Sequence, residues 1–304
     1  MRKTWIKLLS AVLVMAALTA LVLSEPQLTQ DSPGQSFKLT TLSPNEVVSI
    51  TLTQANKAPI TLKRVAASQS TSAQTSPASA DSAAAANNTQ IWLMTAPLSA
   101  RANPVRAAAI ASLAGALSNI AYDSTDLELA KFGLVPPKIQ LTLNDIVIAI
   151  GARQELDDLR YLMRDGQVLL MQDRFYHHLN KSPPGYIDPA LFADDAKLIA
   201  IHTDSFEARM SEGSWTWQPA SAFKSADEVV ALAAQWRLAS ATEVRMMDYQ
   251  LQWSDTVRVE IQGRPPIRLM LARDNNRTWL GRPDTDLQYA LTQQRARTLL
   301  RQQM

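Results

Sequence analysis

The chain has 304 residues, of which 46% are hydrophobic and 19% charged, so it is long enough for two ordinary domains or one large one. Its formal net charge of +2 gives no reason to expect a nucleic-acid partner. The absence of cysteine excludes a disulfide framework, a thiol nucleophile, a zinc–thiolate site and a lipidated cysteine.

The N-terminus has the charge pattern of a membrane-targeting segment. Arg2, Lys3 and Lys7 precede an uncharged apolar run over residues 8–23, and Glu25 follows it. Because basic flanks stay on the cytoplasmic side, we expect the N-terminus to be cytoplasmic and the bulk of the chain to be periplasmic.

The apolar run of 16 residues lies between the length of a signal-peptide core and that of a spanning helix. A signal peptidase requires small residues at two fixed positions, which Val22-Leu23-Ser24 supplies poorly. We therefore predict that residues 1–24 are an uncleaved signal anchor rather than a cleaved peptide. This single-pass helix would contact the inner membrane through residues 5–23.

Residues 25–46 are polar, with scattered Pro, Ser and Thr, and are predicted to form a tether. Alternating apolar and polar residues over 47–63 indicate a hairpin. The low-complexity segment 66–90 cannot bury enough apolar surface to offset its ordering entropy, so we expect a disordered insertion there. A glycan-bearing or partner-binding loop is the alternative.

A strand over residues 91–94 comes next, and Asn103-Pro104 is a typical helix start. The predicted helix carries an apolar stripe of Ile110, Leu113, Leu117 and Ile120. A second, short helix capped by Asp126 is expected to end at Gly133. Two tight hairpins then follow, over residues 139–150 and 160–171.

The same pattern starts again after Pro183-Pro184-Gly185. A hairpin over residues 197–210 is followed by a Trp-bearing strand at Trp215–Trp217. Ser225 and Glu228 have the spacing of a capping box. The helix they begin has a stripe of Val229, Leu232, Ala233 and Trp236. Strands over 257–261, 267–271 and 278–280 precede a final basic helix over about 286–301.

Both halves share an order of parts: hairpin, Trp-bearing strand, proline, capped helix, β-meander and closing helix. The sequence therefore predicts an α+β fold of two similar subdomains, each an antiparallel sheet or β-meander with one or two packed helices, after an N-terminal transmembrane helix. The expected subdomains are residues 47–195, which contain the insertion, and 196–304. A chance succession of hairpins and helices is the alternative.

Several short motifs occur in a fixed order between Val47 and Ile187. They are Ile91–Pro97, Phe132–Pro137, Ile148–Gly151 and Arg160–Leu162. In this order the stretch resembles an uncharacterised exported bacterial family, domain of unknown function 4340. The resemblance implies an N-terminally anchored extracytoplasmic domain, and some relatives accompany ABC-type export or gliding-motility systems. It implies no catalytic residues, and the insertion and second half depart from the family pattern.

Few residues are candidates for chemistry. His177 and His178 are adjacent and point apart on a helix, so a metal or hydrolytic site with His202 is only an alternative. The acidic pairs Asp157-Asp158 and Asp194-Asp195 are typical of turns and caps. Phosphate-binding glycine loops and the nucleophile elbow are absent from the sequence. We predict no cofactor, no metal and no catalytic residue.

Two surfaces are candidates for binding. Trp215 and Trp217 share one strand face, which is core if it points inward and a glycan or peptide platform if it points outward. The C-terminal stretch is rich in arginine, and Arg295, Arg297 and Arg301 lie on its last predicted helix. This bias indicates either a solvated face or a surface for an acidic partner or lipid headgroups.

These observations favour a non-enzymatic, membrane-anchored accessory or scaffold protein of the envelope, serving a transport or surface-assembly complex through an envelope protein partner. The alternatives are an extracytoplasmic glycan- or peptide-binding module, and a hydrolase whose site is not recognised.

Overall fold

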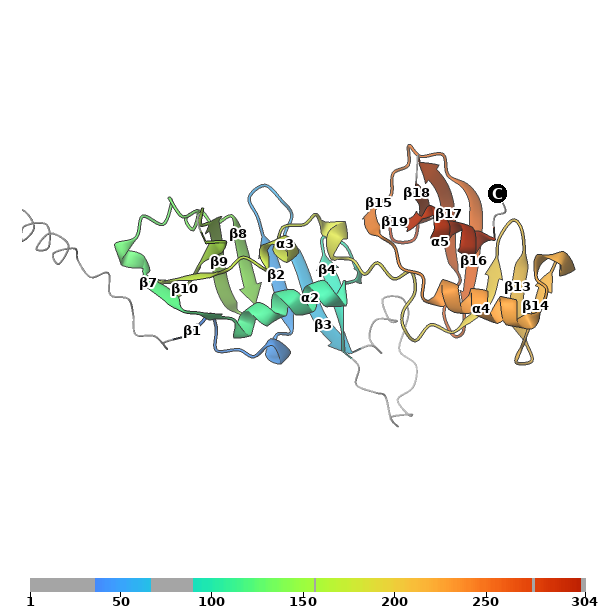
Figure 1. Ribbon diagram of the computed structural model, residues 1–304, viewed down its shortest axis with the longest axis horizontal. Helices are drawn as coiled ribbons and strands as arrows, with labels where there is room; N and C mark the ends of the chain where they lie inside the picture. The colour runs from blue at the N-terminus through green and yellow to red at the C-terminus, as the bar shows by residue number, and fades with distance from the viewer. Residues whose placement is uncertain (1–35, 67–89, 156, 275–276, 302–304) are drawn as a thin grey trace, which may run out of the picture.

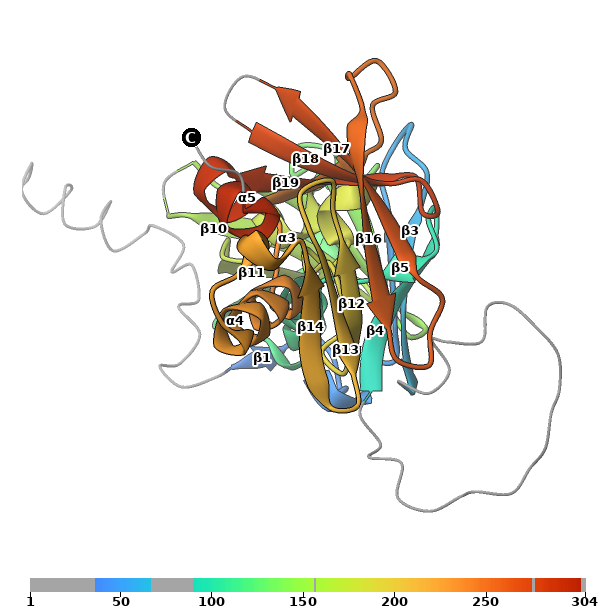
Figure 2. The ribbon, with the colours of Figure 1, turned by 90° about the vertical axis from the view of Figure 1, so that its right-hand side faces the viewer.

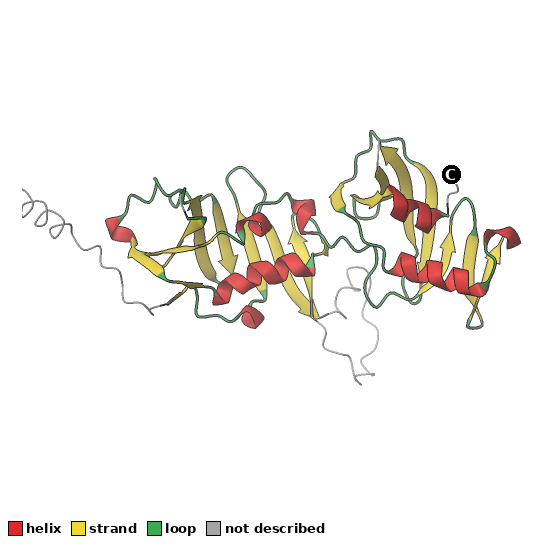
Figure 3. Cartoon of the chain, viewed as in Figure 1, coloured by secondary structure: helices red, strands yellow, loops and turns green. Residues whose placement is uncertain are grey.

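The computed structural model describes residues 36–66, 90–155, 157–274 and 277–301. It is an α+β structure of three antiparallel sheets with a few helices (Figures 1 and 3). The predicted signal anchor, nearly all of the insertion and residues 25–35 of the predicted tether lie outside the described residues. The rest of the predicted tether, 36–46, belongs to the fold instead, because Leu39 is buried and its N donates to Ala116 O at 2.9 Å. Within the described part, no helix has the length and apolarity needed to cross a membrane.

The N-terminal lobe is built on a nine-stranded sheet. In spatial order its strands are β5 (Ala100–Arg101), β4 (Gln90–Ala96), β3 (Ile60–Ala66), β2 (Ser49–Thr53), β8 (Ile139–Leu143), β9 (Ile146–Arg153), β10 (Leu159–Arg164), β11 (Gln167–Gln172) and β7 (Ile120–Asp123). A separate two-stranded sheet pairs β1 (Phe37–Lys38) with β6 (Leu117–Ser118).

The C-terminal lobe is built on an eight-stranded sheet. Its spatial order is β14 (Ser214–Gln218), β13 (Glu207–Ser211), β12 (Leu198–His202), β16 (Ser254–Ile261), β17 (Ile267–Asp274), β18 (Arg277–Arg282), β19 (Leu287–Thr292) and β15 (Glu243–Met246).

The two large sheets follow the same path. In each, three strands form a meander from the middle to one edge, as β2–β3–β4 and as β12–β13–β14. The chain then passes through a helix to a strand at the opposite edge, β7 or β15. It returns to the middle at β8 or β16, and a four-stranded meander leads back to that edge strand. Apart from the short β5, the two strand orders match position by position.

The α-helices also occupy matching places in the chain. Helix α2 (Pro104–Ala111) follows the first meander of the N-terminal lobe, and α4 (Ala226–Arg237) follows that of the C-terminal lobe. Helices α3 (Tyr176–Leu179) and α5 (Gln293–Leu300) follow the last strand of each sheet. Short 3-10 helices complete the structure: η1 (Pro44–Glu46), η3 (Ser112–Gly115), η4 (Ser124–Asp126), η5 (Pro183–Tyr186) and η6 (Ala220–Ala222).

Each sheet is apolar on the face that the helices cover. In β2, Ile50 and Leu52 are buried, and in β16, Val257, Val259 and Ile261 are buried, while the residues between them face outward. Such alternation is expected of an antiparallel sheet with one solvated face. Burying each of these aliphatic side chains contributes about 1.5–3 kcal/mol, so the covered faces hold the fold together.

A paired segment around Asp188 joins the two lobes. It hydrogen-bonds through its backbone to the N-terminal lobe on one side and to the chain after α4 on the other. The four bonds are Asn103 N to Tyr186 O at 2.7 Å, Asp188 N to Arg101 O at 2.9 Å, Leu191 N to Ala239 O at 3.0 Å, and Ala241 N to Pro189 O at 2.8 Å. Phe192 packs near Trp236 of α4, with ring centroids 6.5 Å apart. One buried apolar cluster therefore runs through both lobes.

Most predicted strands are present. The hairpins expected over 47–63, 139–150, 160–171 and 197–210 are β2–β3, β8–β9, β10–β11 and β12–β13. The predicted insertion begins and ends in one ladder, because Ala66 of β3 pairs with Gln90 of β4.

Two predicted helices in the N-terminal half were wrong in extent or type. Helix α2 ends at Ala111, and Leu117 and Ile120 are exposed starts of strands, because Leu39 N pairs with Ala116 O and draws this segment into the small sheet. The helix expected at Asp126 is a succession of turns. Gly133 has a left-handed φ of +62°, which ends any helix there.

Two further corrections concern the C-terminal half. The final helix starts at Gln293 instead of about residue 286, because Leu287–Thr292 is the strand β19, paired on both sides. The capping box at α4 is not formed, since the Ser225 side chain makes no capping bond and Glu228 accepts from Lys224 N at 3.2 Å. The predicted stripe of α4 is buried at all four positions.

Candidate functional site

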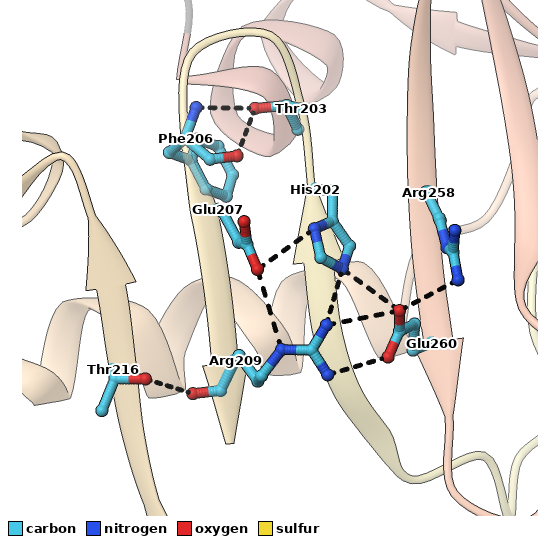
Figure 4. Close-up of polar contacts among 8 residues, drawn as sticks. All are labelled: His202, Thr203, Phe206, Glu207, Arg209, Thr216, Arg258 and Glu260. Carbon is cyan, nitrogen blue, oxygen red and sulfur yellow. Dashed lines mark hydrogen bonds and ion pairs between the residues drawn. The ribbon is translucent and has the colours of Figure 1, made fainter. Parts of the chain in front are cut away.

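The outer face of the C-terminal sheet carries a network of charged side chains (Figure 4). His202 ends β12, opposite Glu207 of β13 and Arg258 of β16. Its Nδ1 lies 3.4 Å from Glu207 Oε1, and its Nε2 lies 3.3 Å from Glu260 Oε1. The pleat of three adjacent strands therefore brings together residues that are far apart in sequence.

Glu260 is the centre of this network. Arg209 Nη1 lies 3.1 Å from its Oε2, and Arg258 Nη2 lies 3.3 Å from its Oε1. Partial burial opposes ionisation, but the hydrogen bond from Arg209 and the nearby positive charges lower the pKa of Glu260 overall. Each carboxylate is thus already neutralised by cations, and the network fixes three strands against one another on an exposed face.

The three histidines do not form one site. His177 and His178 lie on α3 in the N-terminal lobe, with ring centroids 3.8 Å apart, whereas His202 lies in the network of the other sheet. Among the described residues, no group of three or more His, Asp or Glu side chains could hold a metal ion. The geometry gives no support to the hydrolase alternative built on these histidines.

The acidic pairs lie at turns, as their sequence pattern indicated. Asp158 has a left-handed φ of 50° and forms an exposed ion pair with Arg153 at 2.8 Å. Asp195 pairs with Arg264 at 2.6 Å. The Asp158 carboxylate therefore stabilises a local turn, and that of Asp195 joins two segments that are 69 positions apart.

Trp215 and Trp217 do not form an outward platform. Trp215 is only 8% exposed and belongs to the core beneath α4. Trp217 is partly buried and packs edge-on against Phe223, with ring centroids 6.0 Å apart. The inward orientation was one of two interpretations of the sequence, and the burial of Trp215 leaves no platform formed by both rings.

The arginine-rich C-terminal stretch is largely neutralised within the chain. Five of its arginines form ion pairs: Arg258 with Glu260, Arg264 with Asp195, Arg277 with Glu243, Arg282 with Asp284, and Arg301 with Glu228. Arg301 also lies over the Phe223 ring, 4.3 Å from its centroid. Arg301 is therefore held against α4, which removes it from the predicted binding surface.

Arg295 and Arg297 differ from these five arginines. Both are exposed on α5, and within the described parts of the chain neither has an acidic partner. Their helix lies against α4 on one side of the C-terminal lobe, as Figure 2 shows. They are the members of the predicted set that remain available to another molecule.

A groove of about 590 Å³ lies between α4 and α5. Leu238, which is 63% exposed at the end of α4, lines it together with Arg295. The other lining residues are Ala234, Gln235, Thr292, Gln294, Thr298 and Leu299. The groove combines an exposed aliphatic side chain with a cation that has no acidic partner in the described part of the chain. The sequence did not predict it, because it depends on how two distant helices pack.

A cavity of about 460 Å³ opens between the two lobes. Arg101, Asp188, Arg282 and Tyr289 contribute polar groups to it, and Phe192 and Pro265 contribute apolar walls. Burial raises the pKa of the Tyr289 hydroxyl. The sequence alone could not predict this cavity, because its walls come from elements of both lobes.

Comparison with family models, curated proteins and solved structures finds no match for this chain. The resemblance to domain of unknown function 4340 therefore stays a prediction that rests on its motifs.

Proposed function

We propose that this chain is a non-enzymatic, membrane-anchored accessory or scaffold protein of the bacterial envelope, serving a transport or surface-assembly complex. In this proposal residues 1–24 anchor it in the inner membrane, and the part of the predicted tether before residue 36 connects the anchor to the fold. Residues 47–195 and 196–304 are two related periplasmic subdomains, and residues 36–46 pack on the first. The basic flank and apolar run at the N-terminus support the anchor. The matching strand orders of the two large sheets support the relation between subdomains.

The groove between α4 and α5 is the observation that supports a protein partner. Scattered single apolar residues are common on protein surfaces, but here Leu238 lies in a groove beside Arg295. Arg297 adds a second exposed cation on the same helix. Because these arginines have no carboxylate to bind within the described residues, a partner that brings its own carboxylates gains charge-assisted hydrogen bonds here.

The occupant that fits this surface is an acidic, partly apolar segment of another envelope protein. Its aliphatic side chain would cover Leu238, and its carboxylates would meet Arg295 and Arg297. Charge complementarity of this kind mainly raises the association rate and excludes wrong partners. The interaction should therefore weaken as ionic strength rises.

Site-specific photo-crosslinking in intact cells tests the groove. A photoreactive residue replaces Gln294, which is exposed and lines the groove, and a matched control replaces exposed Lys63 on β3. We expect one defined partner at position 294 that is not captured from position 63.

Charge variants make the crosslinking result specific. Arg295→Glu with Arg297→Glu should abolish the crosslink, whereas Arg295→Lys with Arg297→Lys should retain it. Capture of the same partner in equal yield after charge reversal would overturn the groove as the binding surface.

The anchor requires a separate test. The mature protein should resist alkaline extraction from membranes, and its intact mass should include residues 1–24. A soluble mature protein that begins at Glu25 would contradict the anchored state without bearing on the groove.

A further inference from the structure

A second cavity between the lobes, of about 690 Å³, is rich in positive charge. It lies where β15 packs against η5, at the edge of the C-terminal lobe that faces the N-terminal lobe (Figure 1). Arg106 of α2 and Lys181 before η5 line one side, and Glu243 and Arg245 of β15 line the other. The cavity therefore has three cations and one carboxylate among its charged lining residues.

The single carboxylate is already engaged by other arginines. Glu243 accepts from Arg245 Nε at 2.6 Å and from Arg277 Nη1 at 2.5 Å. The hydrogen bond from Arg245 and the charges of both arginines lower the pKa of Glu243 despite its partial burial. Its charge is thus not free to neutralise the opposite wall.

Arg106 and Lys181 have no acidic partner within the described residues. Arg106 Nη1 donates to His177 O at 3.3 Å, and its guanidinium carbon lies 5.8 Å from the Tyr186 ring centroid. Its Nε is buried and has no hydrogen-bond partner among the residues that the structure describes, and the same holds for Nδ1 of His178 on the neighbouring helix α3. Buried polar atoms of this kind are rare in native proteins and call for an explanation.

We propose that this cavity binds an anionic phosphate group through Arg106 and Lys181. The two cations come from different elements and face one space, so a phosphate can accept hydrogen bonds from both at once. The Asn103 amide and the Ser182 hydroxyl also line the cavity and supply neutral donors. A bound anion offsets the mutual repulsion of the cations and gives Arg106 a partner of opposite charge.

The phosphate could be free or could belong to a lipid headgroup, and the titration separates these sources. Full-length protein in a non-ionic detergent is titrated with inorganic phosphate, with glycerol 3-phosphate and with water-soluble dihexanoyl phosphatidylglycerol, and binding is followed by calorimetry. We expect saturable binding that weakens with added sodium chloride. Equal affinities for the three probes indicate recognition of phosphate alone. Much tighter binding of the lipid probe than of the other two indicates recognition of a headgroup.

Arg106→Gln and Lys181→Gln should each raise Kd about tenfold or more, as expected for loss of a charge-assisted hydrogen bond. The matched control is Lys63→Gln with Arg237→Gln, two exposed cations outside the cavity, which should leave Kd unchanged. Arg106→Lys keeps the charge and serves if the glutamine variant fails to fold. Absence of saturable binding with all three probes, or equal weakening in the control, would overturn the proposal.

Discussion

Arg101 and Asp188 form an ion pair, with Nε and Oδ2 2.9 Å apart, that joins β5 to the segment leading into the C-terminal lobe. Arg101 Nη2 also donates to Phe192 O at 2.6 Å, so one guanidinium binds two points of that segment. Burial raises the pKa of Asp188 and outweighs the opposing effects of its hydrogen bond from Ala190 N and of Arg101. The pair therefore orients the junction at the cost of desolvating a carboxylate.

This balance predicts an asymmetry between the two partners. Arg101→Met leaves the Asp188 carboxylate without its cation and should lower the free energy of unfolding by about 3 kcal/mol. Asp188→Asn keeps the acceptor for Ala190 N and removes the charge, so it should change stability by less than about 1 kcal/mol. Urea unfolding at neutral pH measures both. Equal losses in the two variants would contradict a burial-dominated carboxylate.

The pH dependence of Asp188 has a definite sign. Its folded-state pKa is raised, so folding favours the protonated form. Its contribution to stability is greatest below the unfolded pKa and is lost as pH rises through the folded value. In Asp188→Asn this loss disappears. The free energy of unfolding of the variant, relative to that of the parent chain, should therefore increase as pH rises from about 3 to neutrality.

Much of the fold could be predicted from local patterns. Strand β8 alternates apolar and polar residues, and Asp165-Gly166 is a favoured turn between β10 and β11, so both hairpins follow from local properties. The predictions that were wrong concern segments whose secondary structure depends on pairing with strands that are distant in sequence. Leu287–Thr292 has an ambiguous pattern, and it is a strand because β18 and β15 lie on both sides of it. Leu117 likewise leaves the helical stripe because β1 pairs with it.

The candidate sites were less predictable than the strands. Arg295 and Arg297 could be singled out from charge, but their lack of partners depends on where Glu228, Glu243 and Glu260 lie in the fold. Arg106 and Lys181 are unremarkable in the sequence, being 75 positions apart along the printed chain. They face one cavity only because η5 and α2 meet at the lobe junction.

The buried Arg160–Asp173 pair is expected to be a strong determinant of stability. Arg160 donates to both carboxylate oxygens, at 2.9 and 2.6 Å, and to Gly151 O at 2.7 Å, and it stacks over Tyr176. Arg160→Met should cost about 3–5 kcal/mol because it leaves a buried carboxylate unpaired. Adding Asp173→Asn should restore part of the loss.

An exposed ion pair provides the control for Arg160. Arg153 and Asp158 are paired at 2.8 Å with side chains 59% and 62% exposed. Arg153→Met should therefore cost less than about 1 kcal/mol. Chemical denaturation of both variants makes the comparison, and similar costs would show that burial does not govern the contribution of Arg160.

Gly151 in β9 is expected to tolerate no side chain. A Cβ atom there would lie 2.4 Å from Phe132 O, which accepts a hydrogen bond from Ala152 N at 2.7 Å. Gly151→Ala should therefore lower stability by about 1–3 kcal/mol through forced backbone movement. At Gly115 the nearest atom is Pro44 Cδ at 3.3 Å, and Gly115→Ala should cost less. Thermal unfolding that ranks the two variants in the opposite order would contradict this packing.

Replacing the two tryptophans of β14 should lower the free energy of unfolding by different amounts, because the two side chains are buried to different degrees. Trp215→Ala removes a side chain that is 8% exposed and should cost about 3–5 kcal/mol. Trp217 is less buried, and Trp217→Ala should cost about 1–2 kcal/mol. Urea unfolding gives both values. A negligible cost for Trp215→Ala would instead restore the exposed platform.

His178 is expected to couple stability to pH. Burial lowers the pKa of its imidazole, and the positive charges of His177, Arg106 and Lys181 lower it further. Folding therefore favours neutral His178, so its contribution is present above the unfolded pKa of about 6.5 and is lost as pH falls through the folded value. Unfolding free energies measured between pH 8 and pH 5 should fall more steeply in the parent chain than in His178→Gln.

Inorganic phosphate links this titration to the proposed anion site. A phosphate bound by Arg106 and Lys181 offsets two of the charges that lower the His178 pKa, so it should reduce the loss of stability at low pH. The Lys181→Gln variant, in which one charge is absent and phosphate binds weakly, should show a smaller response to added phosphate. An identical pH slope in the parent chain and His178→Gln would show that this imidazole does not carry the effect.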